Sequence, residues 1–301
     1  MFNFSDYTLK INRFGGSEKK ITVQLGDKIF MLKFPDPIRE KNNDLQYMYN
    51  VFSEDIGCKI FKTLGFEVQN TFLAKFDLSK FVPNGGETVV VACENFCNNG
   101  VILSEFSKFL TSDFHYFTLS HSEPTQRFRR VIPIETVINL IHRHPLLNNN
   151  PEFIEKFLEM LVVDTLIGNP DRHSDNWGFI ERNGEIKFAP IYDCGSALSP
   201  LLSDDRLKFL LQSESNFKNH EYNISLAFTC NGERISCPSF YRNPPSLLQE
   251  ALRRIVPKID FVKIQDIIDN TEYISNIRKS YLLKSLRYRF DYILLPAFNK
   301  S

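Results

Sequence analysis

The stretch Leu166-Ile-Gly-Asn-Pro-Asp-Arg-His-Ser-Asp-Asn-Trp-Gly-Phe179 decides how the rest of the chain is interpreted. Its middle, residues 170–176, holds two carboxylates, an arginine, a histidine and an amide. The residues before it repeat apolar side chains at helical spacing and predict a helix over 151–167, with proline in the first turn and Gly168 after the last. So many polar side chains on a loop indicate a functional site.

A β-hairpin is predicted directly after this loop. Residues 177–181 and 185–191 alternate as strands on either side of Asn183-Gly184, the strongest short signal for a tight hairpin turn. A turn centred on these two residues brings Asn176 within two residues of the position opposite Asp193. Diagonal neighbours of this kind lie about 7–8 Å apart, close enough for both side chains to bind one metal ion.

These side chains match the chemistry of phosphoryl transfer. An amide and a carboxylate that converge are suitable ligands for Mg²⁺, which takes a few protein oxygens together with substrate phosphates. Asp171, five residues before Asn176, then remains to accept a proton from an attacking hydroxyl. Taken singly, each residue is more often part of a turn or a strand end. The joint spacing Asp-x₄-Asn-x₁₆-Asp, which ends at Asp193, favours a kinase.

With Ala189-Pro-Ile-Tyr-Asp-Cys-Gly-Ser-Ala197, the opening stretch resembles the catalytic core of the HipA-like serine/threonine protein kinases. It is most similar to the short branch of that family, which includes the bacterial cell-translocating kinases. The resemblance covers nearly the whole chain and implies an α+β, two-lobed protein-kinase-like fold. We expect a small β-rich N-lobe over 1–96, which holds the nucleotide, and a larger, mostly helical catalytic C-lobe over 97–301. ATP and Mg²⁺ are the implied cofactors.

Lys33 and Glu54 are the predicted phosphate-binding pair. Lys33 lies near the end of an apolar strand pattern over 28–34, where a lysine alone would be interpreted as extending to solvent. Glu54 lies on an apolar face of the next helical pattern, 44–64, and a buried acid requires a cation. Kinases hold a strand lysine on the phosphates with a helix glutamate. The resemblance pairs the same two residues, with the acid eleven positions before Gly65.

A glycine loop is expected before the first hairpin. Gly15 and Gly16 permit close approach of the backbone to phosphate, and Ser17 adds a hydroxyl donor. The family's usual self-phosphorylated serine, a few positions before the loop glycine, is replaced here by Arg13 and Phe14, so Ser17 is a nearby candidate. Because so few residues precede this loop, we expect the kinase core without the extra N-terminal subdomain of full-length HipA toxins.

The remaining nucleotide contacts rest on the resemblance. The strand that ends near Glu94 implies a hinge, in which main-chain groups of Glu94 and Phe96 meet adenine. His173 has two equally supported roles: it approaches the nucleotide, or it braces Asp171 through a hydrogen bond.

The composition limits the other function classes. Thirty-six Lys and Arg balance 36 Asp and Glu in 301 residues, which argues against direct binding of nucleic acid. The start lacks a signal peptide pattern, and acids interrupt the most apolar helix, so we expect no membrane span. Cytoplasmic residence is the default, with export as an effector left open. Six scattered cysteines predict free thiols and no zinc site.

The sequence therefore predicts an ATP- and Mg²⁺-dependent serine/threonine protein kinase that is able to autophosphorylate. The resemblance implies a toxin or effector role, a protein substrate, and a separate small antitoxin or regulatory partner. One alternative is a phosphoinositide-type lipid kinase, in which Arg127, Arg129, Arg130 and the basic run 278–289 would contact acidic headgroups. The other is a catalytically silent, partner-binding protein with a kinase fold, disfavoured because every expected catalytic position is filled.

Overall fold

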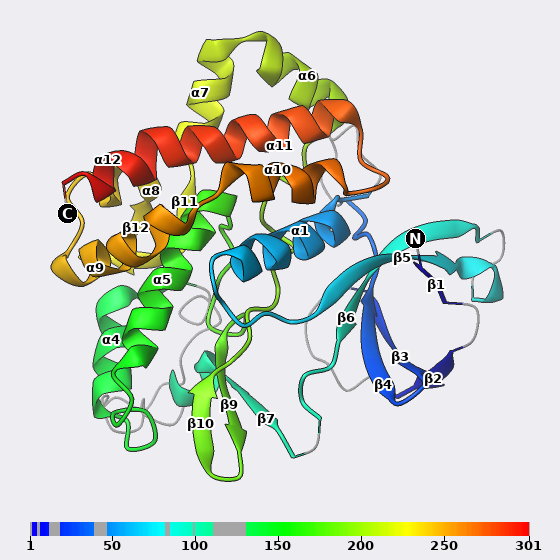
Figure 1. Ribbon diagram of the computed structural model, residues 1–301, viewed down its shortest axis with the longest axis horizontal. Coiled ribbons are helices and arrows are strands. Elements are labelled where there is room, and N and C mark those ends of the chain that lie inside the picture. Colours follow the sequence, from blue (N-terminus) through cyan, green and yellow to red (C-terminus); the bar gives the residue numbers. More distant parts are fainter. Residues whose placement is uncertain are drawn as a thin grey trace.

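The chain folds into a β-sheet part and a mostly helical part that lie side by side (Figure 1). The computed structural model describes residues 2–4, 7–11, 19–38, 47–81, 85–98, 100–110 and 131–300. The α+β class and the two-part organisation expected from the sequence are confirmed. The division at residue 96 stays a prediction, because helix α1 of the first part (Asn50–Thr63) shares one hydrophobic core with the helices of the second.

The first part is built on a sheet with the strand order β1-β5-β6-β4-β3-β2. Its neighbours are antiparallel except β1 and β5. Strands β3 and β4 form the first hairpin, with Leu25 opposite Lys28 and a turn at Gly26-Asp27, where Gly26 has φ +62°. One sheet face packs its own small core, separate from the main one. The strands are β1 (Phe2–Asn3), β2 (Thr8–Lys10), β3 (Lys20–Leu25), β4 (Lys28–Lys33), β5 (Thr71–Asp77) and β6 (Glu87–Glu94).

Helix α1, Asn50–Thr63, lies between this sheet and the helical part. It begins later than the predicted 44, because Met48 donates its N–H to the carbonyl of Asp36 and is not helical. Its end agrees with the prediction, since Gly65 follows at φ +92°, a conformation that glycine adopts without strain. Nearly every side chain of α1 is buried, which fixes the helix between the two parts.

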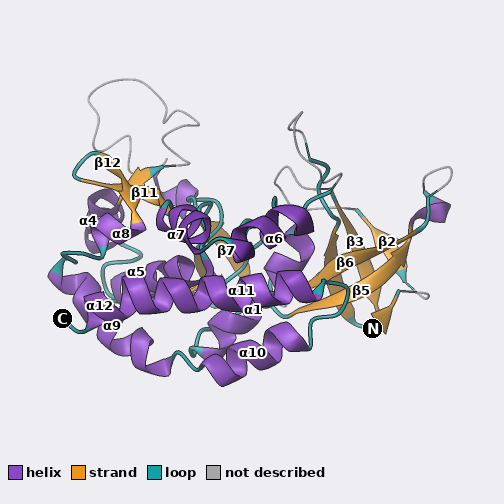
Figure 2. Cartoon of the chain, turned by 90° about the horizontal axis from the view of Figure 1, so that it is seen from above, coloured by secondary structure: helices purple, strands orange, loops and turns teal. Residues whose placement is uncertain are grey.

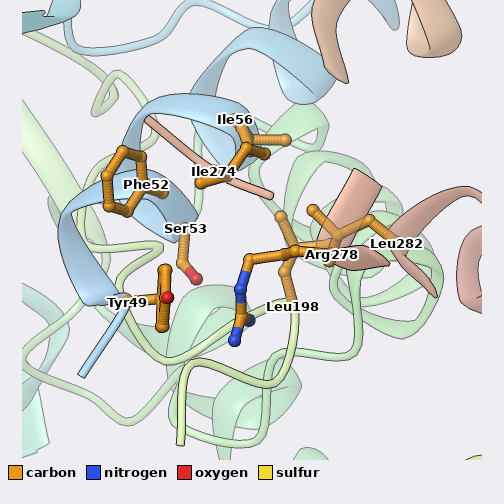
Figure 3. A pocket seen from close by; sticks show the side chains of 8 residues that line it. All are labelled: Tyr49, Phe52, Ser53, Ile56, Leu198, Ile274, Arg278 and Leu282. Atoms are coloured by element: carbon orange, nitrogen blue, oxygen red, sulfur yellow. The ribbon is translucent and has the colours of Figure 1, made fainter. Parts of the chain in front are cut away.

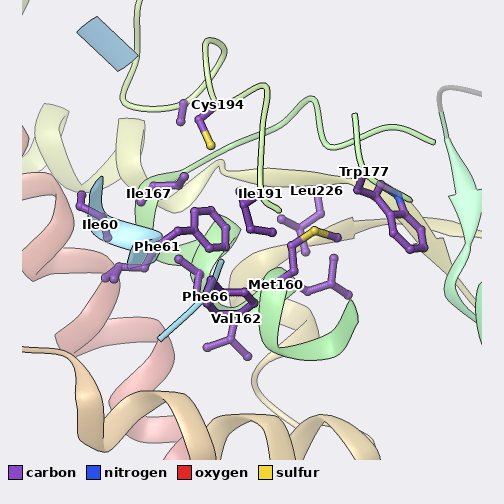
Figure 4. Close-up of a cluster of buried hydrophobic side chains, with 14 of the residues drawn as sticks. Ile60, Phe61, Phe66, Met160, Val162, Ile167, Trp177, Ile191, Cys194 and Leu226 are labelled. Carbon is purple, nitrogen blue, oxygen red and sulfur yellow. The ribbon is translucent and has the colours of Figure 1, made fainter. Parts of the chain in front are cut away.

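The second part surrounds helix α5, whose end leads into the polar loop. Its apolar side chains meet those of α1 and Trp177 in one cluster (Figure 4). Helix α11 runs across this part next to α10 (Figure 2). The helices are α4 (Ile134–Arg143), α5 (Glu152–Ile167), α6 (Asp204–Gln212), α7 (Glu214–Tyr222), α8 (Cys237–Phe240), α9 (Ser246–Ile255), α10 (Phe261–Asp269), α11 (Asn276–Arg289) and α12 (Leu295–Phe298), with 3₁₀ turns at Leu78–Lys80 and Val256–Lys258 and a π-helical segment at Phe290–Leu294.

Two small sheets complete the second part. The predicted hairpin register is confirmed, with Glu185 opposite Arg182 and a turn at Asn183 and Gly184, both at positive φ. The second strand ends at Phe188, earlier than the predicted 191. The strands are β7 (Ile102–Glu105), β9 (Gly178–Arg182) and β10 (Glu185–Phe188) in one sheet, and β8 (Ile132–Pro133), β11 (Ser225–Cys230) and β12 (Glu233–Ser236) in the other. Across the described ranges, none of the helices has the length and apolar character needed to cross a membrane.

Candidate active site

A buried cation and two carboxylates meet where the sheet faces the helical part. Lys33, at the end of β4, places its Nζ 3.1 Å from Glu54 Oε2 and 2.8 Å from Asp193 Oδ1. Glu54 is fully buried, and its other oxygen accepts a hydrogen bond from the N–H of Asp193 at 2.9 Å. The structure therefore joins the lysine and the helix acid predicted as a pair, and adds the candidate metal ligand to them.

Asp193 is held in an unusual backbone conformation. Its φ is +58°, a left-handed geometry that costs a non-glycine residue roughly 1–2 kcal/mol. The peptide that precedes it is held at both ends, because Arg172 donates to the Tyr192 carbonyl and the Asp193 N–H donates to Glu54. Burial opposes the charged carboxylate, but the attraction of Lys33, helped by Arg172 and His173, outweighs it and lowers the pKa of Asp193.

Gly57 lets helix α1 approach the loop that carries Asp193. A β-carbon at this position would lie 2.7 Å from Cys194 Cβ, closer than such atoms come in folded proteins. Gly57 is one turn after Glu54, so the same helix face supplies both the carboxylate and the close approach. The absence of a side chain at Gly57 is thus what allows Glu54 to reach the Asp193 N–H.

We predict that Gly57→Ala weakens nucleotide-dependent activity and lowers stability by about 1–3 kcal/mol, because overpacking pushes α1 away from the loop. Urea unfolding and the KM for ATP measure the two effects. Gly86→Ala is the matched control, since a β-carbon there meets nothing within 4 Å. Equal behaviour of the two variants would contradict the role of the close approach.

Asp171 lies on the loop after α5 with its carboxylate accessible, the side chain being 48% exposed. Its Oδ2 accepts a hydrogen bond from Ser196 Oγ at 3.3 Å, and its N–H donates to Asn169 Oδ1. The sequence did not single out Ser196, although it stands three residues after Asp193. The Asp171 carboxylate is thus accessible, and Ser196 orients one of its two oxygens.

We expect Ser196→Ala to lower kcat by about tenfold with little change in the KM for ATP, because a hydrogen bond to a charged group contributes about 1.5–3 kcal/mol. Ser196→Thr, which keeps the hydroxyl, should restore most of the rate. Steady-state kinetics with both variants test this. A loss that Thr does not rescue would show that the hydroxyl does not orient Asp171.

Asn176 has an orientation that suits a metal ligand. Its Nδ2 donates to the carbonyl of Asp171 at 2.9 Å, so the amide oxygen is the atom left for a cation. Arg172 Nη1 donates to the carbonyls of both Asn176 and Tyr192, which brings the segments of Asn176 and Asp193 together. The described residues contain no group of three or more His, Cys, Asp and Glu that would hold a metal by itself. One amide and one carboxylate fit a Mg²⁺ site completed by phosphate oxygens.

The imidazole of His173 lies beside the Asp171 carboxylate without a hydrogen bond to it, whereas the main-chain N–H of His173 donates to the Asp171 carbonyl at 2.8 Å. Its Nε2 is 3.9 Å from Asp171 Oδ1, and its Nδ1 accepts from the N–H of Asp175 at 3.3 Å. The Nε2 side of the imidazole faces the carboxylate, and both roles of His173 stay predictions.

Glu94 and Phe96 lie at the strand exit expected for the hinge. The Glu94 N–H donates to Asn70, and its carbonyl accepts from Gln69, so only a second lone pair of that carbonyl is left for adenine. Its carboxylate pairs with Lys28 at 3.0 Å. The Phe96 ring packs against Tyr192 at 6.0 Å between centroids, which connects the hinge to the Asp193 loop.

Gly15, Gly16 and Ser17 lie outside the described residues, as do Arg127, Arg129 and Arg130.

Only part of the basic run 278–289 faces solvent: Arg287 is exposed, whereas the first and last arginines of the run are buried. Arg278 and Arg289 are only 1% and 2% exposed. Arg278 stacks on the ring of Tyr49 at 3.5 Å beside a small pocket below the start of α1 (Figure 3). Arg289 pairs with Glu221 at 2.9 Å. The sequence of an arginine-rich helix does not reveal which arginines are buried, because their partners are far away in the chain.

A cavity of about 1010 Å³ lies elsewhere, between the ends of the sheet strands and the start of α1. Aromatic side chains including Phe34, Phe52 and Tyr273 line it. Lys33, Glu54 and Asp193 do not line this cavity, so it is distinct from the candidate active site.

Comparisons with known proteins agree with this geometry. A family model described as the HipA-like C-terminal domain matches residues 13–259. The chain is 30% identical to the serine/threonine-protein kinase CtkA of Helicobacter pylori, over 100% of this chain and 88% of that protein. The crystal structure of a Helicobacter pylori proinflammatory kinase CtkA superposes with a TM-score of 0.86, at 28% identity, covering 99% of this chain and 97% of that one.

A more distant match shows the same fold. HipA of Shewanella oneidensis, solved with HipB and operator DNA, gives a TM-score of 0.51 at 18% identity, covering 90% of this chain and 59% of that one. The two-lobed kinase fold expected from the sequence is thus confirmed. The chain belongs to the HipA-like C-terminal domain family, and it is a HipA-like kinase.

Proposed function

We propose that this protein transfers the γ-phosphoryl group of ATP to a serine or threonine hydroxyl of a protein. The observation that carries the proposal is the Lys33–Glu54–Asp193 cluster together with an accessible Asp171, which Ser196, three residues after Asp193, holds by a hydrogen bond. The name of the Helicobacter relative, a serine/threonine-protein kinase, supports the choice of acceptor.

Each residue of the candidate active site has a defined role in this reaction. Asp171 orients the acceptor hydroxyl and takes its proton as the oxygen attacks the γ-phosphorus and ADP leaves. Lys33, oriented by Glu54, shifts from Asp193 to the nucleotide phosphates and neutralises their charge. Asn176 and Asp193 would hold Mg²⁺, which supplies further charge neutralisation when bound. Main-chain groups at Glu94 and Phe96 would bind adenine, and Gly15, Gly16 and Ser17 would cover the phosphates.

The proposal extends to self-phosphorylation and to a partner. Ser17 is the candidate acceptor in this chain, and a mass increase of one phosphoryl group that Ser17→Ala abolishes would establish it. The Shewanella HipA was solved with HipB, so we propose a small antitoxin-like partner here as well.

Incubation of the purified protein with Mg²⁺ and γ-labelled ATP tests the function. Label in protein, lost in Asp193→Asn, supports the proposal. Label only in added phosphoinositide would favour a lipid kinase, and absence of nucleotide binding would point to a silent kinase-fold protein.

A further inference from the structure

Arg172 is the most completely bonded buried side chain of the site. It is 0% exposed, and five hydrogen bonds use the five N–H groups of its guanidinium. Two go to the Asp164 carboxylate, at 2.9 and 3.1 Å, and one goes to Cys194 Sγ. The other two go to the main-chain carbonyls of Asn176 and Tyr192. A fully bonded and buried group has no donor left for nucleotide or acceptor.

The two carbonyls belong to the segments that carry the candidate metal ligands. One is the carbonyl of Asn176 itself, and the other is half of the peptide that leads into Asp193. Both accept from the same atom, Arg172 Nη1, although the segments are separate in sequence. A planar, rigid guanidinium therefore fixes the spacing between the two ligand segments.

The guanidinium is itself anchored to the central helix. Asp164 of α5 is fully buried and also accepts a hydrogen bond from Asn169 at 3.0 Å. The ring of Phe61 on α1 lies 5.7 Å from the guanidinium carbon. The position of Arg172 is thus set by both helices that flank the site.

We propose that Arg172 is a positioning residue for the metal ion, which sets the spacing and orientation of Asn176 and Asp193. This inference rests on the proposed function and deepens its metal site. A merely structural buried ion pair would affect stability, whereas a positioning residue affects the contribution that the metal makes to nucleotide binding.

Arg172→Lys in the full chain tests the inference, because a lysine ammonium cannot span both carbonyls and the Asp164 carboxylate. Calorimetry measures the affinity for a non-hydrolysable ATP analogue with and without Mn²⁺, a probe for oxygen-ligand sites. We expect the gain in affinity due to Mn²⁺ to fall at least tenfold, while metal-free binding changes less than twofold.

Arg289→Lys is the matched control. Arg289 is also buried, pairs with Glu221 at 2.9 Å and donates to the carbonyl of Leu166 at the end of α5. It contacts neither ligand segment, so its variant should lose stability and keep the full gain from Mn²⁺. If the two variants lose the same fraction of that gain, or neither loses any, Arg172 is structural only.

Asp164→Asn gives a second route if Arg172→Lys does not fold. This change keeps the side-chain volume and loosens the anchor of the guanidinium. It should reduce the gain in affinity due to Mn²⁺ without changing metal-free binding, and an unchanged gain would overturn the inference.

A wild-type protein that gains affinity from Mn²⁺ but phosphorylates no protein would overturn the proposed activity alone, and the comparison of variants would still decide the role of Arg172. A wild-type protein without any gain from Mn²⁺ would overturn the metal site and the inference together.

Discussion

Asp171→Asn should lower kcat by about 10²–10⁴-fold, the usual contribution of a general base, while the KM for ATP changes little. An amide cannot accept the proton of the acceptor hydroxyl, yet its oxygen still accepts from Ser196 Oγ. The side chain is about half exposed, so stability should change by less than about 0.5 kcal/mol. Kinetics with labelled ATP and urea unfolding measure both quantities.

Asp175→Asn is the matched control for this variant. Asp175 is 49% exposed on the same loop and contacts His173 on the ring side away from Asp171. The Asp175→Asn change removes one negative charge from the loop and leaves the contacts of Asp171 in place, so activity should stay near wild type. Equal loss in both variants would show that loop charge, and not a specific base at Asp171, supports the reaction.

Local sequence patterns predict the structure correctly where residues close in sequence determine it. The Asn183-Gly184 turn set the hairpin register, because both residues adopt positive φ at low cost. Gly65 and Gly168 ended their helices for the same reason. The position of Lys33 and Glu54 also followed, since an acid on an apolar helix face requires a nearby cation.

Long-range contacts could not be predicted in this way. Asp164 was interpreted only as an interruption of an apolar helix, and its bidentate contact with Arg172 depends on how the loop turns back after Gly168. The same holds for Arg278, whose partner Tyr49 is far away in sequence. The pattern also placed the start of α1 too early, because the N–H of Met48 pairs with the Asp36 carbonyl instead of with a helical turn.

Lys33→Ala should lower kcat/KM for ATP by about 10²–10³-fold, since a preorganised charge on the reacting group has effects of this size. This change removes little packing, so the sequence alone predicts that the fold survives it. The structure predicts otherwise. Glu54 is fully buried, and the change removes the cation 3.1 Å from its Oε2, which should cost about 3 kcal/mol of stability.

The double variant Lys33→Ala/Glu54→Gln separates these two effects. Glutamine removes the buried charge of residue 54, and its oxygen can still accept from the Asp193 N–H. We expect urea unfolding to show recovery of most of the lost stability, while phosphorylation of protein remains as low as in Lys33→Ala. The charge of Lys33 would then be needed for the reaction itself. If activity returned together with stability, Lys33 would serve only to neutralise Glu54, and another cation would have to bind the phosphates.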